Sequence, residues 1–246
     1  MSRELAAWVR ASRACVVLTG AGVSTASGIP DFRGDRGLWS REDVGRVASI
    51  DGFRADPIGF YAFWSRQLEG LARAQPNDAH RVIAKLEARG LVHTLITQNV
   101  DGLHGEAGSR DVLEAHGSFR RARCLSCGAR YVTADFIAEL RPGEAPTCTI
   151  CSGLVKPDVV LFGDAMDASF ERARAAVHAC DLFIAMGTSL EVAPVADLVP
   201  EAIERGAKVV IINRDATSFD DDVALVLGGD LVERMRELAR EMAIEW

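Results

Sequence analysis

The chain has 246 residues, enough for one large α/β domain or for a large domain with a small insertion. Its 26% charged residues are typical of a globular protein, and its net charge of −7 argues against charge-driven nucleic-acid binding. Residues 1–8 lack the apolar core of a signal peptide, and no apolar run approaches the roughly 20 residues that span a bilayer. We therefore expect a cytoplasmic protein, with no membrane or direct nucleic-acid partner, in which clustered thiols bind metal.

Short apolar runs alternate with amphipathic segments along the chain. The runs are predicted to be buried strands, at Cys15–Thr19, Val92–Thr97, Val159–Phe162, Leu182–Met186 and Val209–Ile212. The amphipathic segments are predicted to be helices, at Asp56–Ala74, Asp78–Arg89, Met166–His178, Val195–Arg205 and Leu231–Met242. Buried strands that alternate with helices predict an α/β fold, with a Rossmann-like parallel sheet covered by helices on both faces.

The segment 118–157 does not follow this alternation, because it is rich in Cys, Gly and Arg and its apolar pattern is short and broken. We predict that it is a small inserted zinc-ribbon module. The predicted domains are therefore a discontinuous Rossmann-like domain, formed by 1–117 and 158–246, and a zinc-binding module at 118–157.

Two C-x-x-C pairs lie in that segment, Cys124 with Cys127 and, twenty residues further on, Cys148 with Cys151. Each pair presents two thiolates from a tight turn, and four thiolates complete a tetrahedron around Zn²⁺. The alternative is a pair of redox dithiols or disulfides, which is uncommon in a cytosolic chain. Four Cys ligands leave no position for water, so the predicted zinc is structural and takes no part in chemistry.

The first predicted strand runs into a glycine turn at Gly20 and Gly22, which allow a sharp turn and a close approach to a ligand. Ser24, Thr25 and the opening of the next helix would supply donors for a pyrophosphate. The dehydrogenase fingerprint G-x-G-x-x-G fails, because Thr25 stands where the third Gly should be. The loop 29–34 that follows is open to two interpretations, a surface turn or part of a binding site.

Polar segments follow three of the apolar runs, at Thr97–His104, Met186–Leu190 and Ile212–Arg214, and Glu114–Gly117 places an imidazole just before the predicted zinc module. Asn and Asp there could be ordinary helix caps, and a lone histidine such as His116 is often structural. In open α/β sheets, however, ligands bind outside the carboxyl ends of the strands. Polar groups at several strand ends on one edge favour a binding site.

Taken together, these motifs resemble the sirtuin family over nearly the whole chain. The matching segments keep the family's order and spacing: GAGVSTASGIPDFRG (20–34), TQNVDGLH (97–104), HG (116–117), the four cysteines, KPDVVLFGD (156–164), GTSLEVAP (187–194) and IN (212–213). The resemblance implies an enzyme that uses NAD to remove acyl groups, acetyl above all, from the lysine side chains of proteins or peptides. It implies NAD and one structural Zn²⁺ as cofactors, and nicotinamide and O-acyl-ADP-ribose as products.

The resemblance also implies residue roles. His116 would be the catalytic base, and Asn99 and Asp101 would position nicotinamide. The NAD site would comprise Gly20, Ala21, Gly22, Thr25, Phe32, Arg33, Gln98, Asn99, Val100, Asp101, His116, Gly187, Thr188, Ser189, Asn213, Arg214 and Asp230. An acyl-lysine peptide would pair as an added strand between 159–163 and 191–195, at Val159, Val160, Phe162, Gly163 and Val192.

In the implied reaction, the bond from ribose to nicotinamide breaks, the acyl oxygen attacks the ribose, and His116 removes a proton from a ribose hydroxyl. Imidazole suits general-base work near neutral pH. Phe32 would exclude water, which otherwise hydrolyses NAD.

One departure bears on the acyl group. Sirtuins that prefer acidic acyl groups carry a Tyr and, three positions later, an Arg. Here Trp64 stands three positions after Tyr61, and Arg66 is out of register. A carboxylate would lack a bidentate partner, so we predict uncharged acyl groups.

Two other functions stay open on the sequence. An ADP-ribosyltransferase or NAD glycohydrolase would use the same NAD pocket without a peptide groove. A non-catalytic zinc-ribbon interaction module would leave Asn99, Asp101 and His116 without a role. The sequence leaves the oligomeric state open and is compatible with a monomer.

Overall fold

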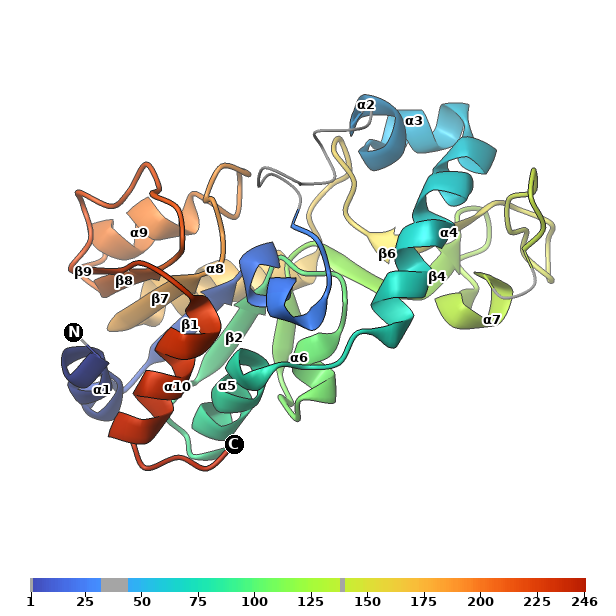
Figure 1. The fold of residues 1–246 in the computed structure, drawn as a ribbon. Helices are drawn as coiled ribbons and strands as arrows, with labels where there is room; N and C mark the ends of the chain where they lie inside the picture. The colour runs from blue at the N-terminus through green and yellow to red at the C-terminus, as the bar shows by residue number, and fades with distance from the viewer. Residues whose placement is uncertain (1, 32–43, 138–139) are drawn as a thin grey trace.

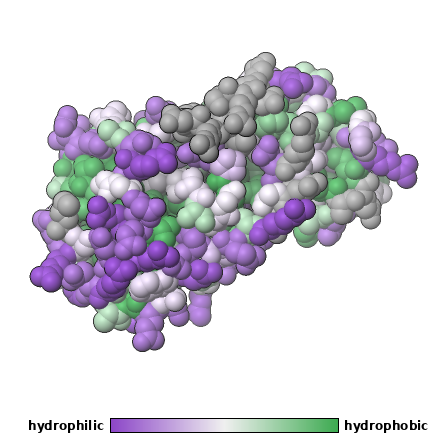
Figure 2. Space-filling model, viewed as in Figure 1, coloured by the Kyte–Doolittle hydropathy of each residue, from purple (hydrophilic) through white to green (hydrophobic). Residues whose placement is uncertain are grey.

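The structure, a computed structural model, describes residues 2–31, 44–137 and 140–246. It has two lobes, a larger one around a six-stranded sheet and a smaller one around a three-stranded sheet (Figure 1). In the described residues, no helix is long and apolar enough to cross a membrane. On the face in Figure 2, hydrophilic residues cover most of the surface and apolar residues lie in small separate groups.

The larger sheet is parallel and has the strand order β3-β2-β1-β7-β8-β9. Its strands are β1 (Cys15–Thr19), β2 (Thr94–Thr97), β3 (Val112–Glu114), β7 (Leu182–Met186), β8 (Lys208–Ile212) and β9 (Leu225–Leu227). The chain builds outward from β1 in one direction and from β7 in the other. This is the order of dinucleotide-binding sheets, in which the ligand crevice lies where the order reverses.

Both faces of the sheet are buried. In β1, Cys15 and Val17 pack with one set of helices, whereas Val16 and Leu18 pack with the other. The first set is α1 (Ser2–Ala11), α5 (Asp78–Ala88) and α10 (Leu231–Glu241), and the second is α8 (Ala168–Ala179) and α9 (Leu198–Glu204). The predicted α/β fold is therefore confirmed, because helices cover a parallel sheet on both sides.

The smaller sheet has the order β5-β4-β6 and is antiparallel. Its elements are β4 (Gly117–Cys124), β5 (Arg130–Val132), α7 (Thr133–Ile137) and β6 (Val155–Val159). The short helix α6 (Leu103–Glu106) follows β2 and precedes β3 along the chain. The strand that the sequence predicts at 159–162 is thus displaced. The observed strand ends at residue 159 and pairs with β4. The hydrophobic pattern misses it because Lys156 and Pro157 interrupt the apolar residues of a buried segment.

Three helices join the smaller lobe although they precede it in the chain: α2 (Val44–Ala48), α3 (Ile50–Ala55) and α4 (Pro57–Arg73). Phe53, Phe60 and Trp64 share a core cluster with Phe119 and Val159. The domain division given above stays a prediction. This packing favours placing 44–73 with the zinc-binding segment rather than with the larger sheet.

Candidate active site and zinc site

Five strands of the larger sheet deliver polar segments to one edge. Gly20 follows β1, Gln98 follows β2, and Gly187 follows β7. His116 comes two residues after the end of β3, and Asn213 comes directly after β8. Because the strands are parallel, all their carboxyl ends meet at this edge.

The glycine turn after β1 packs directly on the loop after β7. The Gly22 N–H donates to the Gly187 carbonyl at 2.8 Å, and a Cβ on Gly22 would lie 2.8 Å from the Gly187 Cα. Gly187 has φ +62°, and a Cβ there would meet the Val23 nitrogen at 2.5 Å. These glycines are required where the two central loops cross, at the reversal of strand order.

The helix predicted after the glycine turn is not formed. Residues 21–27 make two 3₁₀ turns instead, η1 (Ala21–Val23) and η2 (Thr25–Ser27), and Gly28 ends them with φ +84°. Ser24 lies between the turns and is 1% exposed. Its hydroxyl donates to Asp101 Oδ2 at 2.7 Å, and the role predicted for it as a pyrophosphate donor stays a prediction.

Ser24 joins the two side chains expected to hold nicotinamide. Asn99 Nδ2 donates to Ser24 Oγ at 3.0 Å, and the second Asp101 oxygen accepts from the Leu103 N–H at 2.9 Å. Asn99 and Asp101 are 5% and 6% exposed. The network fixes an amide and a carboxylate in a buried site, although the motif shows no reason to group Ser24 with them.

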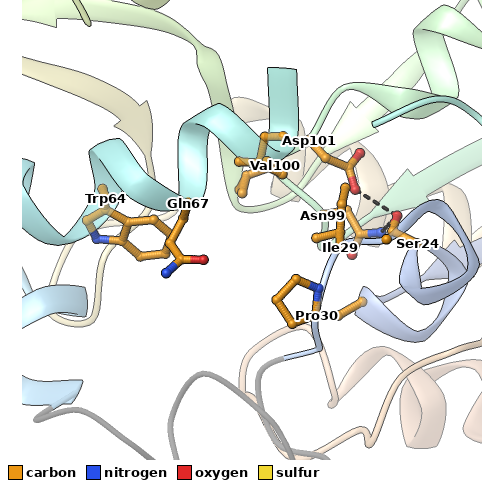
Figure 3. A pocket seen from close by; sticks show the side chains of 12 residues that line it. Ser24, Ile29, Pro30, Trp64, Gln67, Asn99, Val100 and Asp101 are labelled. Carbon is orange, nitrogen blue, oxygen red and sulfur yellow. Dashed lines mark hydrogen bonds between the residues drawn. The ribbon is translucent and has the colours of Figure 1, made fainter. Parts of the chain in front are cut away.

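These three side chains form the polar wall of a pocket between the lobes (Figure 3). The opposite wall comes from α4, which contributes Trp64 and Gln67. The remaining lining residues are Ala21, Gly28, Ile29, Pro30, Gly70, Leu71 and Val100. A mostly apolar pocket with a few convergent polar groups is the usual form of a small-molecule site.

His116 is not among the residues that line this pocket, but it contacts Gln98, the residue directly before Asn99. The imidazole Nδ1–H donates to the Gln98 carbonyl at 3.2 Å. Because a carbonyl can only accept, the proton of the neutral ring is on Nδ1 and the lone pair is on Nε2. The Gln98 amide donates to Thr188 Oγ1 at 2.9 Å, so one residue connects the loops that follow β2, β3 and β7.

Some residues predicted to bind NAD also have structural partners. Thr25 donates its hydroxyl to the Gly22 carbonyl, the Asn213 amide donates to the Asp215 carbonyl, and Asp230 caps α10 by accepting from the Glu233 N–H. Ser189 and Arg214 are exposed, and Arg214 forms an ion pair with Asp215. Contacts of all these residues with NAD stay predictions. The remaining two predicted residues, Phe32 and Arg33, lie outside the described residues.

The segment predicted to bind peptide is anchored by a buried lysine. Lys156 Nζ donates to the Val159 carbonyl at 2.6 Å and to Asp164 Oδ2 at 3.0 Å, which closes the loop between them. Burial lowers the pKa of Lys156, and the neighbouring Asp164 carboxylate opposes that shift. Lys156 is a site-forming residue that the sequence reasoning missed.

Part of this loop already has hydrogen-bond partners within the chain. Val159 is buried and pairs with Gly117, and the Val160 N–H donates to the His116 carbonyl at 2.9 Å. Phe162 is half-exposed, but its N–H and carbonyl pair with the 48–50 segment. Gly163 has φ +87°, and Val192 accepts from the Ala196 N–H. Their pairing with a peptide stays a prediction.

The four predicted zinc ligands come together at one end of the smaller sheet. Their Sγ atoms lie within 4.8 Å of one another, with 3.5 Å between Cys124 and Cys151 and 3.6 Å between Cys127 and Cys148. A tetrahedron with Zn–S bonds of about 2.3 Å would place its sulfurs ~3.8 Å apart. The Tyr131 hydroxyl donates to Cys148 at 2.9 Å and lowers the pKa of that thiol to about 6. The donor set fits Zn²⁺.

Two buried imidazoles lie beneath the Asn99–Asp101 segment. The rings of His80 and His104 have centroids 4.8 Å apart. Burial lowers the pKa of His80 to about 4, with a smaller contribution from Arg81. Burial lowers the pKa of His104 to about 3, with a smaller contribution from His80. Both rings are therefore neutral at pH 7.

This pair predicts a loss of stability in mild acid. Below the ordinary histidine pKa of 6.5, the unfolded chain binds protons that the folded chain does not bind. The free energy of unfolding is therefore highest above pH 6.5 and falls as the pH drops. Each ring should contribute a slope of about 1.4 kcal/mol per pH unit. Urea unfolding at pH 7.5 and pH 5 would measure this slope. His104→Gln should reduce it by about half, and an unchanged slope would contradict the assignment.

Comparison with known proteins agrees with this geometry. Residues 20–194 match the model of the Sir2 family, and the chain belongs to that family. It is 44% identical to an NAD-dependent protein deacetylase of Saccharolobus solfataricus, over 83% of this chain and 82% of that protein. It is 42% identical to NAD-dependent protein deacylase 2 of Archaeoglobus fulgidus, over 99% of this chain and 98% of that protein.

Solved Sir2 structures have the same fold. A complex of Sir2 with a p53 peptide and NAD⁺ has a TM-score of 0.92 at 37% identity and covers all of both chains. A Sir2 variant with a deacetylated p53 peptide and 3′-O-acetyl ADP ribose has a TM-score of 0.95 at 37% identity, with 99% of each chain covered. A third, at 37% identity with a TM-score of 0.91, is bound to a propionylated peptide and covers 99% of this chain and 99% of that one.

Proposed function

We propose that this chain is an NAD-dependent protein-lysine deacylase that transfers an acyl group from lysine to ADP-ribose and releases nicotinamide. The observation that carries the proposal is the position of Gln98, whose carbonyl orients His116 and whose amide binds Thr188 beside the buried Asn99. A base held in one orientation, a buried amide–carboxylate pair and a pocket next to the glycine turn after β1 are the parts this reaction needs. The relatives' activities support the same reaction.

The described residues fit NAD. The pocket offers the Asn99 amide and the Asp101 carboxylate. The amide can donate to the oxygen of a carboxamide, and the carboxylate can accept from its N–H groups. When bound, NAD supplies a ribose carbon with nicotinamide as its leaving group. Asn99 and Asp101 bind and orient the nicotinamide end, held by Ser24. His116 accepts a proton at Nε2, and its Nδ1–H bond to Gln98 steadies the ring as charge develops.

The substrate is an acyl-lysine peptide, which binds at the loop that Lys156 and Asp164 close. The Cys124, Cys127, Cys148 and Cys151 site holds a structural Zn²⁺ and takes no part in the reaction. Zinc thiolates need a reducing compartment, which supports a cytoplasmic location.

The acyl preference follows from α4. The Tyr61 hydroxyl donates to the Val155 carbonyl at 2.8 Å inside the core, and Trp64 lines the pocket three positions later. Neither offers a charged partner for a carboxylate. We expect acetyl- and propionyl-lysine peptides to be turned over at least about tenfold faster than succinyl-lysine peptides, because a charge-assisted bidentate contact is missing. Equal turnover of the succinyl peptide would contradict this assignment.

The test is incubation with NAD and each peptide, followed by mass spectrometry of the products. Peptide-dependent nicotinamide and O-acyl-ADP-ribose are expected. NAD hydrolysed to ADP-ribose without any need for peptide would indicate a glycohydrolase, and ADP-ribosylated protein would indicate a transferase. Unconsumed NAD would indicate a binding module.

A further inference from the structure

A chain of buried hydrogen bonds runs from α6 to the candidate nicotinamide pocket. It begins at His104, which is 3% exposed and whose Nε2 lies 2.9 Å from Thr19 Oγ1. Thr19 is the last residue of β1 and is fully buried, and its hydroxyl lies 2.8 Å from that of Thr97, the last residue of β2. The imidazole thus contacts the end of β1 directly and is linked through Thr19 to the end of β2.

The chain ends on the pocket itself. Thr97 Oγ1 accepts from the backbone N–H of Asn99 at 3.0 Å, which fixes the backbone from which the Asn99 side chain projects. That side chain donates to Ser24, and Ser24 donates to Asp101. Asn99, Ser24 and Asp101 all line the pocket, whereas His104, Thr19 and Thr97 lie behind them.

We propose that His104 is a positioning residue for the nicotinamide end of the site, acting through Thr19 and Thr97 on Asn99. The inference rests on the proposed function. Hydrogen bonds in a buried, low-dielectric site are stronger than in water, so the bonds from His104 Nε2 through Thr19 and Thr97 restrain the Asn99 backbone. His104 Nδ1 has no hydrogen-bond partner among the described residues, so the ring acts on the site through Nε2. Here the arrangement that is held is the one in which the Asn99 amide and the Asp101 carboxylate face the same pocket.

The ring is suited to this role because it stays neutral. Its surroundings contain His80, 4.8 Å away between centroids, and Asp101 lines both the nicotinamide pocket and a second cavity that His104 borders. Arg110, Glu114 and Arg120 also line this second cavity. A neutral imidazole adds hydrogen-bonding geometry behind the pocket without adding a charge beside the Asp101 carboxylate.

The first test compares His104→Leu with His104→Gln. Leucine keeps apolar volume and loses the bond to Thr19, whereas the Gln side-chain amide can replace the ring Nε2. For His104→Leu we expect kcat/KM for NAD to fall about tenfold and the inhibition constant of nicotinamide to rise similarly, with KM for acetyl peptide within about twofold of wild type. His104→Gln should recover to within about threefold of wild type. His93→Leu, at an exposed position directly before the opposite end of β2, is the matched control and should leave all three values unchanged.

A second pair keeps the test decisive if His104→Leu fails to fold. Thr97→Val removes the hydroxyl that accepts from Asn99 and keeps the branched shape, whereas Thr97→Ser keeps the hydroxyl. Valine should reproduce the loss in kcat/KM for NAD and serine should not. Where both single variants fold, the double variant His104→Leu/Thr97→Val should be little worse than either, because both interrupt one chain of hydrogen bonds.

The outcomes separate this inference from the proposed function. If the wild-type protein releases no nicotinamide, the proposed function fails. If the wild type is active and the His104→Leu and Thr97→Val variants match it in NAD kinetics and nicotinamide inhibition, only the positioning role fails. Equal impairment of His104→Leu and His104→Gln, or an equal rise in peptide KM, would assign His104 to packing alone and would also overturn the inference.

Discussion

His116→Ala is expected to lower kcat by about a hundredfold or more, the usual contribution of a general base, while the fold and most NAD affinity are kept. The side chain is half-buried and lies outside the large core clusters, so its removal leaves little cavity. The measurement is nicotinamide release under saturating NAD and acetyl peptide, together with NAD binding by calorimetry.

His116→Asn is the sharper comparison. The Asn amide can donate to the Gln98 carbonyl as the ring Nδ1 does, but it carries no basic nitrogen. If His116 acts as the base, Asn is as inactive as Ala. Recovery of turnover in the Asn variant would assign His116 to holding Gln98 in place, and wild-type turnover in the Ala variant would remove it from the reaction.

Cys124→Ala is expected to release zinc, unfold the smaller sheet and abolish activity. The core around the site is small, and its fully buried members are Ala122, Cys124, Cys148 and Val155, so metal binding supplies much of the folding free energy. The loss should reach the active site, because Cys124 ends β4, and β4 begins at Gly117 directly after His116.

Cys180→Ala is the matched control, since Cys180 is a buried thiol in the core beneath α8 and not a zinc ligand. Metal analysis, thermal unfolding and deacylation should separate the two variants, with one zinc per chain kept in Cys180→Ala. A Cys124→Ala protein that is folded and fully active would overturn the zinc assignment. Treatment of the wild type with a strong chelator should reproduce the Cys124→Ala result.

Local chemistry allowed much of this molecule to be predicted. The strands at 15–19 and 182–186 have the bounds that the apolar runs predict, because each is buried on both faces and is therefore continuously apolar. Asn77 stands directly before the helix predicted at Asp78–Arg89 and caps α5, since its side chain accepts from the Ala79 N–H. The zinc cluster follows from spacing alone, because a C-x-x-C turn brings its own two sulfurs together.

Other features have no local signal. The strands β3 and β9 are three residues each, too short for a period to show. The packing of α2–α4 against the smaller sheet depends on Phe119 and Val159, which are remote in sequence. The glycines after β1 suggest a ligand turn, whereas their closest neighbour is the loop after β7.

The sequence by itself determined the central strands and the long helices, the four clustered thiols, and three strand ends that carry polar groups. It did so because burial, capping and metal ligation each require particular residue types at positions close together in the sequence. Only the tertiary structure decided that Ser24 binds Asn99 and Asp101, that Gln98 orients His116, and that His104 lies behind them. Those contacts join residues separated by 18 to 85 positions, and parallel strand order alone brings them to one edge.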